Sequence, residues 1–143
     1  MGLPKTDIVK VITQEAVNEI SDIAYEEKHE KGAVLFREGD SAKYFYILVE
    51  GKVVLTVGEA ATSRYEVTQP GESFGWSSAV GRDFYSGTAE CLVPTTVLKL
   101  DKLDLERVFD KHPRSGKVFY RLLAEALGQR WIDLNRRWTL ELV

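Results

Sequence analysis

Short apolar runs separated by glycine and proline turns fill the middle of the chain, and they constrain its fold more than any other feature. The longest is Tyr44–Glu50, which is apolar, aromatic and β-branched; Gly51 turns it and Lys52–Val57 returns. Runs of this kind, bounded by turn residues, are typical of antiparallel strands. Further strands are predicted at 34–36, 64–68, 87–92 and 95–100. Many short strands at nearly regular spacing indicate a double-sheet roll or barrel over residues 25–100.

Helical periodicity appears on both sides of this β region. Over residues 6–24, apolar side chains recur every three or four positions, and Thr13 is placed to cap a second helical segment. After the strands, Asp101 is a favourable N-cap with Asp104 in the first turn of a helix. Pro113 ends that helix and can begin the next. We therefore predict C-terminal helices over 101–140, the last running from about Pro113 to Trp138.

The composition is that of an ordinary globular domain and excludes several kinds of site. The chain has 143 residues, and 44% of them are hydrophobic, which is enough for a core. The net charge of −3 argues against nucleic acid as the main partner. A single cysteine, Cys91, excludes an internal disulfide framework and favours a reducing, cytoplasmic compartment. Since no apolar run approaches the length of a membrane span, no membrane partner is expected.

The segment Phe74–Thr88 reads as a short helical turn between two strands. Gly75 precedes the turn, and the small residues Ser77, Ser78 and Ala79 lie within it. Such a turn points free backbone N–H groups and a positive dipole end at one spot, which suits an anion. The segment is therefore the candidate ligand site.

This segment resembles the phosphate-binding cassette of the cyclic-nucleotide-binding superfamily, which includes bacterial transcription regulators, kinase regulatory subunits and gated channels. The segments Lys31–Asp40, Phe45–Leu48, Gly51–Val53 and Pro70–Gly75 follow the superfamily's β-roll signature in order and spacing. The likeness as a whole extends over roughly residues 8–135. Within the superfamily, the chain is similar to the sensor domain of the catabolite-activator and fumarate-nitrate-regulator proteins. The resemblance implies a single domain over 1–143, an antiparallel double-stranded β-helix (jelly roll or β-roll) flanked by N-terminal helices and a long C-terminal helix. It also implies a regulatory role in signal transduction.

Two residues of the superfamily's cassette are replaced. The family pattern is Phe-Gly-Glu-x-Ala-Leu, a loop, then Arg-x-Ala-Thr; the glutamate holds the ribose and the arginine holds the cyclic phosphate. Counted from Phe74, Trp76 stands at the glutamate position and Tyr85 at the arginine position. A charge-assisted pair contributes about 1.5–3 kcal/mol, so its loss weakens binding about ten- to a hundredfold. We therefore expect weak or no binding of cyclic AMP or cyclic GMP. The cassette positions assigned by resemblance are Phe74, Gly75, Trp76, Ser77, Ser78, Ala79, Arg82, Tyr85, Ser86 and Thr88.

The altered pocket is compatible with three uses. Some anion affinity can remain through the backbone amides of 77–79, with Ser86 nearby and Arg82 reaching in. Alternatively, Trp76, Phe84 and Tyr85 provide aromatic surface for a flat or apolar small molecule. In the third reading the aromatic side chains fill the pocket, and the domain is a ligand-free interaction module.

Relatives with altered cassettes sense haem, 2-oxoglutarate or halogenated aromatics. Haem needs an axial ligand, and His29, His112 and Cys91 are the only candidates. None has a spacing that indicates iron, so no cofactor or metal is predicted. A metal-dependent cupin is excluded because two distant histidines cannot build its site. No nucleophile elbow or Walker loop is present either, so we predict no catalytic activity.

The last helix carries an apolar stripe that is wider than one β-roll needs. In the resembling regulators the equivalent helix dimerises and closes over the ligand, so a homodimer is expected. The alternative is that the tryptophans of the stripe fold back on the domain's own roll. A DNA-binding unit follows this helix in the regulators, but too few residues follow it here, so we expect no direct DNA binding and an unknown protein as the output partner. The predicted dimerisation residues are Leu123, Leu127, Trp131, Leu134 and Trp138.

Overall fold

The computed structural model describes residues 14–58 and 63–142, with side chains as far as residue 136. The predicted helical segment before residue 14, including the cap at Thr13, lies outside the described residues, as does the side chain of Trp138.

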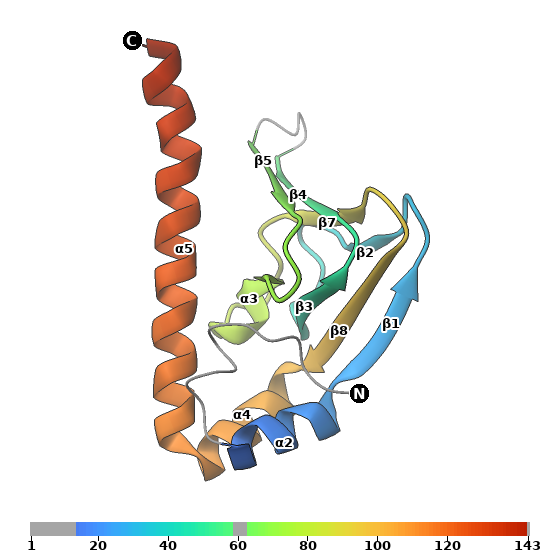
Figure 1. Ribbon diagram of the computed structural model, residues 1–143, viewed down its shortest axis with the longest axis vertical. Helices are drawn as coiled ribbons and strands as arrows, with labels where there is room; N and C mark the ends of the chain where they lie inside the picture. Colours follow the sequence, from blue (N-terminus) through green and yellow to red (C-terminus); the bar gives the residue numbers. More distant parts are fainter. Residues whose placement is uncertain (1–13, 59–62, 143) are drawn as a thin grey trace.

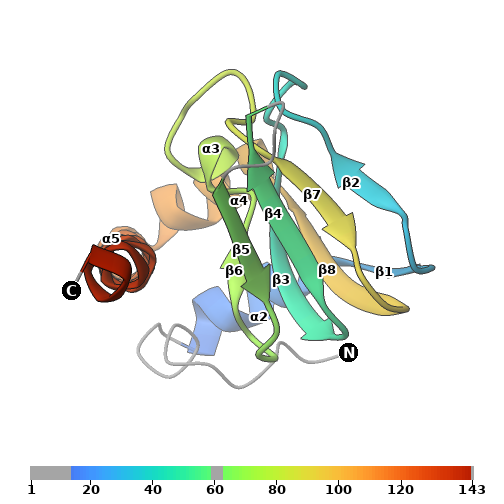
Figure 2. The ribbon, with the colours of Figure 1, turned by 90° about the horizontal axis from the view of Figure 1, so that it is seen from above.

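In the described parts of the chain, the strands form two antiparallel four-stranded sheets that face each other (Figures 1 and 2). One sheet has the order β1-β8-β3-β6 and the other the order β2-β7-β4-β5. The first sheet contains β1 (Tyr25–His29), β8 (Thr95–Asp101), β3 (Tyr44–Glu50) and β6 (Ser73–Phe74). The second contains β2 (Val34–Phe36), β7 (Thr88–Cys91), β4 (Val53–Val57) and β5 (Ser63–Val67). The predicted β-roll is confirmed, and each strand predicted individually ends within one residue of its expected bounds.

Strand β3 separates the two hydrophobic clusters of the molecule. Phe45 and Tyr46, which are consecutive residues of β3, point to opposite faces of the sheet, as pleating requires. Phe45 packs with the helices on one face, and Tyr46 packs inside the roll on the other. This double burial explains why Tyr44–Glu50 reads as a continuous apolar run rather than an alternating one. The roll interior comprises Phe36, Ala42, Tyr46, Leu48, Val53, Val67, Phe74, Tyr85, Ala89, Cys91 and Val97.

The turn after β3 depends on a glycine. Gly51 has φ +107°, which residues with a Cβ rarely adopt. A Cβ there would also lie 2.5 Å from Thr95 Oγ1 and 2.7 Å from Thr95 Cα. The close approach lets the Lys52 N–H donate to Thr95 Oγ1 and ties this turn to the start of β8.

Three helices cover the outer face of the first sheet or border it (Figure 1). They are α2 (Gln14–Ile23), α4 (Lys102–Lys111) and α5 (Pro113–Leu142). The predicted cap is present, because the Asp101 carboxylate accepts the N–H groups of Leu103 and Asp104 at 2.8 and 3.3 Å. Pro113 begins α5, as predicted, and this helix extends beyond the predicted end to Leu142. The helices and sheet share a second cluster, which includes Ala16, Ile20, Phe45, Leu98, Leu100, Leu105, Phe109, Phe119 and Leu123.

Helix α5 positions the candidate site. It starts beside α4 and α2, passes the short helix α3 (Trp76–Ala79), and continues past the roll (Figure 1). Seen from above, it lies to one side of both sheets, with α3 between them and the helix (Figure 2). None of the helices described is both long and apolar enough to span a membrane.

Candidate functional site

A glycine sets the direction of the short helix that opens the candidate site. Gly75 has φ +76° and ψ +35°, in the left-handed region. A Cβ at this position would lie 3.0 Å from the Tyr44 carbonyl oxygen and 3.1 Å from Tyr46 Cδ2. The chain therefore passes close against β3 and turns directly into α3. The Ser78 hydroxyl donates to the Gly75 carbonyl at 2.8 Å and fixes this turn. The short helical turn expected from the sequence is thus present.

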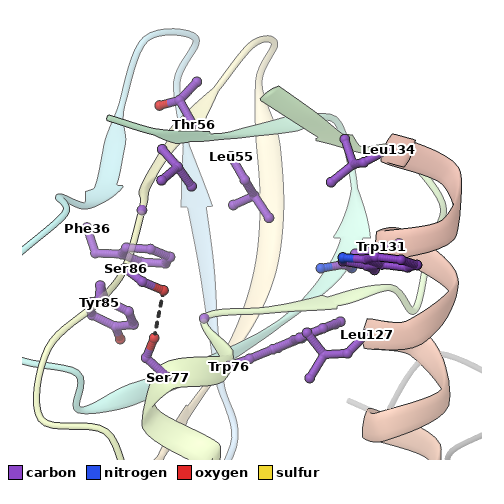
Figure 3. A pocket seen from close by; sticks show the side chains of 14 residues that line it. Phe36, Leu55, Thr56, Trp76, Ser77, Tyr85, Ser86, Leu127, Trp131 and Leu134 are labelled. Carbon is purple, nitrogen blue, oxygen red and sulfur yellow. Dashed lines mark hydrogen bonds between the residues drawn. The ribbon is translucent and has the colours of Figure 1, made fainter. Parts of the chain in front are cut away.

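Between α3, the roll and α5 lies a pocket of about 360 Å³ (Figure 3). Its size is in the range of small-molecule sites. The wall is mainly apolar. Trp76 projects into this space from α3, and Leu127, Trp131 and Leu134 project into it from α5 (Figure 3). The roll contributes Phe36, Leu55, Thr56, Val57, Tyr85, Ser86 and Gly87.

Tyr85 presents its ring to the pocket and keeps its hydroxyl elsewhere. The ring stacks on Phe36 with centroids 3.8 Å apart and is 4% exposed. The hydroxyl donates to the Tyr44 carbonyl at 2.6 Å and accepts the Tyr44 N–H at 3.0 Å. Burial raises the pKa of the Tyr85 hydroxyl, so this group is neutral at physiological pH. Position 85 therefore adds a buried aromatic ring to the pocket wall and no cation.

Trp76 borders the pocket without filling it. The indole is half-buried, and its N–H donates to Ser73 Oγ at 3.1 Å. One face of the ring receives the Arg130 guanidinium, whose Cζ lies 4.2 Å from the ring centroid. This distance is that of a cation–π contact.

Arg130 brings the one cationic side chain to the pocket among the described residues, and it comes from α5. Its guanidinium lies between Trp76 and Tyr65, 4.6 Å from the Tyr65 ring centroid. Nη2 donates to the Ser73 carbonyl and lies 3.5 Å from Glu72 Oε2. Burial lowers the pKa of Arg130, while Tyr65 and Glu72 act against that shift. Sequence reasoning missed this residue, although an arginine three positions after Leu127 and four before Leu134, inside an apolar helical stripe, is a usable signal.

Few hydroxyls reach the pocket wall. Ser77 Oγ and Ser86 Oγ lie 3.4 Å apart and hydrogen-bond to each other (Figure 3). Ser77 is buried on α3, and Ser86 is exposed on the loop that follows. With Thr56, these are the uncharged side chains on the wall that can bond a polar ligand atom.

Other cassette positions lie away from the pocket wall. Phe74 and Ser78 are fully buried, and Ala79 packs in the helix-facing cluster. Thr88 Oγ1 accepts the Glu38 N–H at 3.0 Å. Their side chains support the fold around the site.

Two residues of the cassette loop point to solvent. Arg82 is exposed, and its guanidinium does not line the pocket. Phe84 is 61% exposed and does not line it either. The prediction that Phe84 adds aromatic surface to the pocket is therefore wrong. The loop turns Tyr85 inward onto Phe36 and leaves its neighbour outside.

The residues predicted on the dimerisation stripe fall into two groups. Leu123 is 1% exposed and packs in the domain's own core with Phe119, so it has no free surface for a partner. Leu127 and Trp131 are 43% and 67% exposed, and both line the pocket together with the half-buried Leu134.

The three haem-ligand candidates lie on separate elements. His29 is on β1, Cys91 is on β7, and His112 lies between α4 and α5. In the described part of the chain, no three His, Cys, Asp or Glu side chains gather as a metal site.

Comparison with known proteins gives consistent matches. A family model described as cyclic nucleotide-binding domain matches residues 26–112, more than half of the chain. A predicted potassium channel protein of Rhodopseudomonas palustris is 27% identical over 100 residues, covering 70% of this chain and 24% of that protein. The chain therefore spans about a quarter of the length of this curated relative.

Solved structures show the same architecture. A predicted cyclic nucleotide-binding protein from Geobacter metallireducens is 26% identical, with a TM-score of 0.76 over 87% of this chain and 92% of the other. The catabolite activator protein of Thermus thermophilus is 22% identical, with a TM-score of 0.74 over 91% of this chain and 62% of the other.

Proposed function

The chain belongs to the cyclic nucleotide-binding domain family, and we propose that it is a sensory domain whose pocket takes a largely apolar small molecule in preference to cyclic AMP or cyclic GMP. One observation carries this proposal. The pocket has a volume of about 360 Å³ while aromatic rings stand at the two positions to which the family resemblance assigns the ribose and phosphate contacts.

The side chains at these positions give a cyclic nucleotide little to bind. The Tyr85 hydroxyl is engaged by the backbone of Tyr44, and the Trp76 N–H is engaged by Ser73. A ribose and a cyclic phosphate would leave water for a wall with few free polar groups, and unpaired polar atoms are costly. Apolar surface on a ligand, by contrast, is matched by Trp76, Leu55 and the α5 side chains.

The output proposed for the domain follows from the origin of the pocket wall. Three apolar side chains and Arg130 reach the pocket from α5. A ligand that fills the space contacts the roll and the helix together, and it stabilises the arrangement in which they are closest. Another protein would read that arrangement.

Titration separates this proposal from nucleotide sensing. We expect isothermal calorimetry with cyclic AMP and cyclic GMP to give no binding below the high-micromolar range. A thermal-shift screen of aromatic and alicyclic compounds should give a hit that raises Tm. Trp76→Ala should reduce that shift, whereas Phe84→Ala, which removes an exposed aromatic ring of the same loop, should leave it unchanged. Low-micromolar binding of either nucleotide would overturn the proposal, and a screen without hits would favour the ligand-free interaction module.

The exposed apolar face of α5 supports a second function, homodimerisation. Leu127 and Trp131, one turn apart on this helix, are 43% and 67% exposed, and Ile132, about 100° further round the helix from Trp131, is 40% exposed. Exposed apolar patches mark interaction sites. Ile132 does not line the pocket, so Ile132→Glu tests the interface separately. Analytical ultracentrifugation should show a dimer that this variant dissociates. Leu103→Glu on α4, a leucine 53% exposed, should leave it intact. If the wild-type protein is still a monomer at about 100 µM, the dimer is excluded.

A further inference from the structure

We propose that Arg130 reads an acidic group on the ligand, so that the pocket takes a flat apolar molecule carrying one anionic group, such as an aromatic carboxylate or sulfonate. This inference rests on the proposed function of the same pocket and names its ligand class. It places the charge-recognising residue on the last helix rather than in the cassette.

The guanidinium has unused donors at the pocket. An arginine side chain carries five N–H donors in a planar fork. Within the described residues, Nη2 of Arg130 donates to the Ser73 carbonyl and lies 3.5 Å from Glu72 Oε2, and the Tyr65 hydroxyl also interacts with the guanidinium. The five donors outnumber these three partners, and Arg130 lines the pocket although its side chain is only 14% exposed. A neutral ligand that displaces water from these donors leaves them unpaired, whereas an anion replaces the lost hydrogen bonds.

Glu72 does not complete the pairing of Arg130. Its carboxylate already accepts the N–H groups of Thr68 and Gln69 at 3.3 and 2.9 Å and the Tyr65 hydroxyl at 3.1 Å. The Glu72–Arg130 distance of 3.5 Å is longer than a good charge-assisted hydrogen bond. Glu72 also does not line the pocket. The carboxylate thus helps to anchor the guanidinium from one side and leaves the pocket side free.

Two aromatic rings hold the guanidinium in a fixed orientation. Trp76 and Tyr65 approach its Cζ to 4.2 and 4.6 Å. A stacked arginine is more restricted than a free one, so less side-chain entropy is lost when it binds an anion. Trp76 also lines the pocket, and its ring would therefore contact the body of a ligand bound to Arg130.

The same arrangement separates an aromatic acid from a cyclic nucleotide. Both carry one anionic group. A cyclic nucleotide also brings a ribose hydroxyl and base nitrogens, and Ser77, Ser86 and Thr56 are the uncharged polar side chains on the wall. The remaining polar atoms would be buried without partners, which a site of this kind rejects.

A matched pair of probes tests the inference. 1-Anilinonaphthalene-8-sulfonate and N-phenyl-1-naphthylamine share one aromatic body and differ by the sulfonate. Binding is followed by energy transfer from the tryptophans, two of which, Trp76 and Trp131, line the pocket. We expect the anionic probe to bind the wild-type protein about tenfold or more tightly than the neutral probe, as one charge-assisted contact implies. Arg130→Gln should bring this ratio close to one by weakening only the anionic probe. Arg82→Gln, the same change at an exposed arginine outside the pocket, should leave the ratio unchanged.

The outcomes distinguish the role of Arg130 from the existence of the apolar pocket. Equal affinities for both probes in the wild-type protein would overturn the role of Arg130 and leave the proposed apolar pocket standing. Binding of neither probe would overturn both. If Arg130→Gln weakens the two probes equally, Arg130 only holds α5 in place and the inference fails. If circular dichroism shows that Arg130→Gln loses helix, Arg130→Lys decides instead. It keeps a cation, so a folded Lys variant must still prefer the anionic probe, and equal binding would refute the inference.

Discussion

Removing the Tyr85 hydroxyl tests the account of position 85 most directly. Tyr85→Phe keeps the ring stacked on Phe36, with centroids 3.8 Å apart, and deletes only the oxygen. That oxygen bonds both the carbonyl and the N–H of Tyr44, at 2.6 and 3.0 Å. The substitution therefore leaves a donor and an acceptor of the backbone without this partner.

The expected loss of stability follows from these two bonds. A typical hydrogen bond contributes about 0.5–1.5 kcal/mol, and a buried group left unpaired costs more than the average bond provides. Two bonds to one partly buried residue therefore predict a loss of about 1–3 kcal/mol in the free energy of unfolding. For a chain of this size, that corresponds to a fall in Tm of about 3–8 °C.

Urea unfolding followed by circular dichroism measures the effect. We expect a lower midpoint with an unchanged m value. Tyr25→Phe is the control, because Tyr25 is 62% exposed on β1, and its midpoint should match the wild type. A Tyr85→Phe midpoint equal to that of the control would refute the reasoning. The hydroxyl would then contribute nothing measurable to the stability of the fold.

Three more perturbations test neighbouring parts of the account. Burial raises the pKa of both Tyr85 and Tyr46 above the ordinary value of 10.0, so the folded state holds these protons longer than the unfolded state does. The titration of these two hydroxyls should leave the stability unchanged below pH 10 and lower it as the pH rises above 10. Urea midpoints that do not fall between pH 8 and 11 would contradict the raised pKa of these tyrosines. Asp101→Ala removes the cap of α4 and should cost about 1 kcal/mol in urea unfolding, and no loss would mean that water replaces the carboxylate. Gly51→Ala combines φ +107° with a contact of 2.5 Å to Thr95 and should lower Tm by more than Asp101→Ala does; a smaller effect in calorimetry would show that the turn relaxes.

Features with local causes were predictable from the sequence. The Asp101 cap, the start of α5 at Pro113 and the turn at Gly51 each depend on a residue's own side chain or backbone preference. The strands with apolar runs were also predictable, because strand pairing tolerates many sequences once the apolar pattern is present. Two strands were not predicted individually: β6 has only two residues and therefore no period, and β1 contains no apolar run.

The candidate site depends on contacts that the sequence does not display. Tyr85 and Tyr44 are 41 positions apart, yet their hydrogen bonds decide which neighbouring aromatic residue turns inward and leave Phe84 outside. Arg130 donates to Ser73 from 57 positions away. Leu123 belongs to the same helical stripe as Leu127, and only the packing of α5 against the core separates their roles. Periodicity gives the face of a helix but not the point along it where the core ends.

The identities of Trp76 and Arg130 depend on each other. A carboxylate at position 76 would lie beside the guanidinium and take up its donors as an ion pair, so neither group would remain for a ligand. An indole at 76 instead holds the guanidinium through its ring face, at 4.2 Å, and uses none of its N–H donors. The aromatic residue therefore preserves the hydrogen-bonding capacity of Arg130 while keeping its position. Because Arg130 is on α5, a ligand that binds its guanidinium would contact this helix directly, while the stacking on Trp76 of α3 would limit how far the helix can shift.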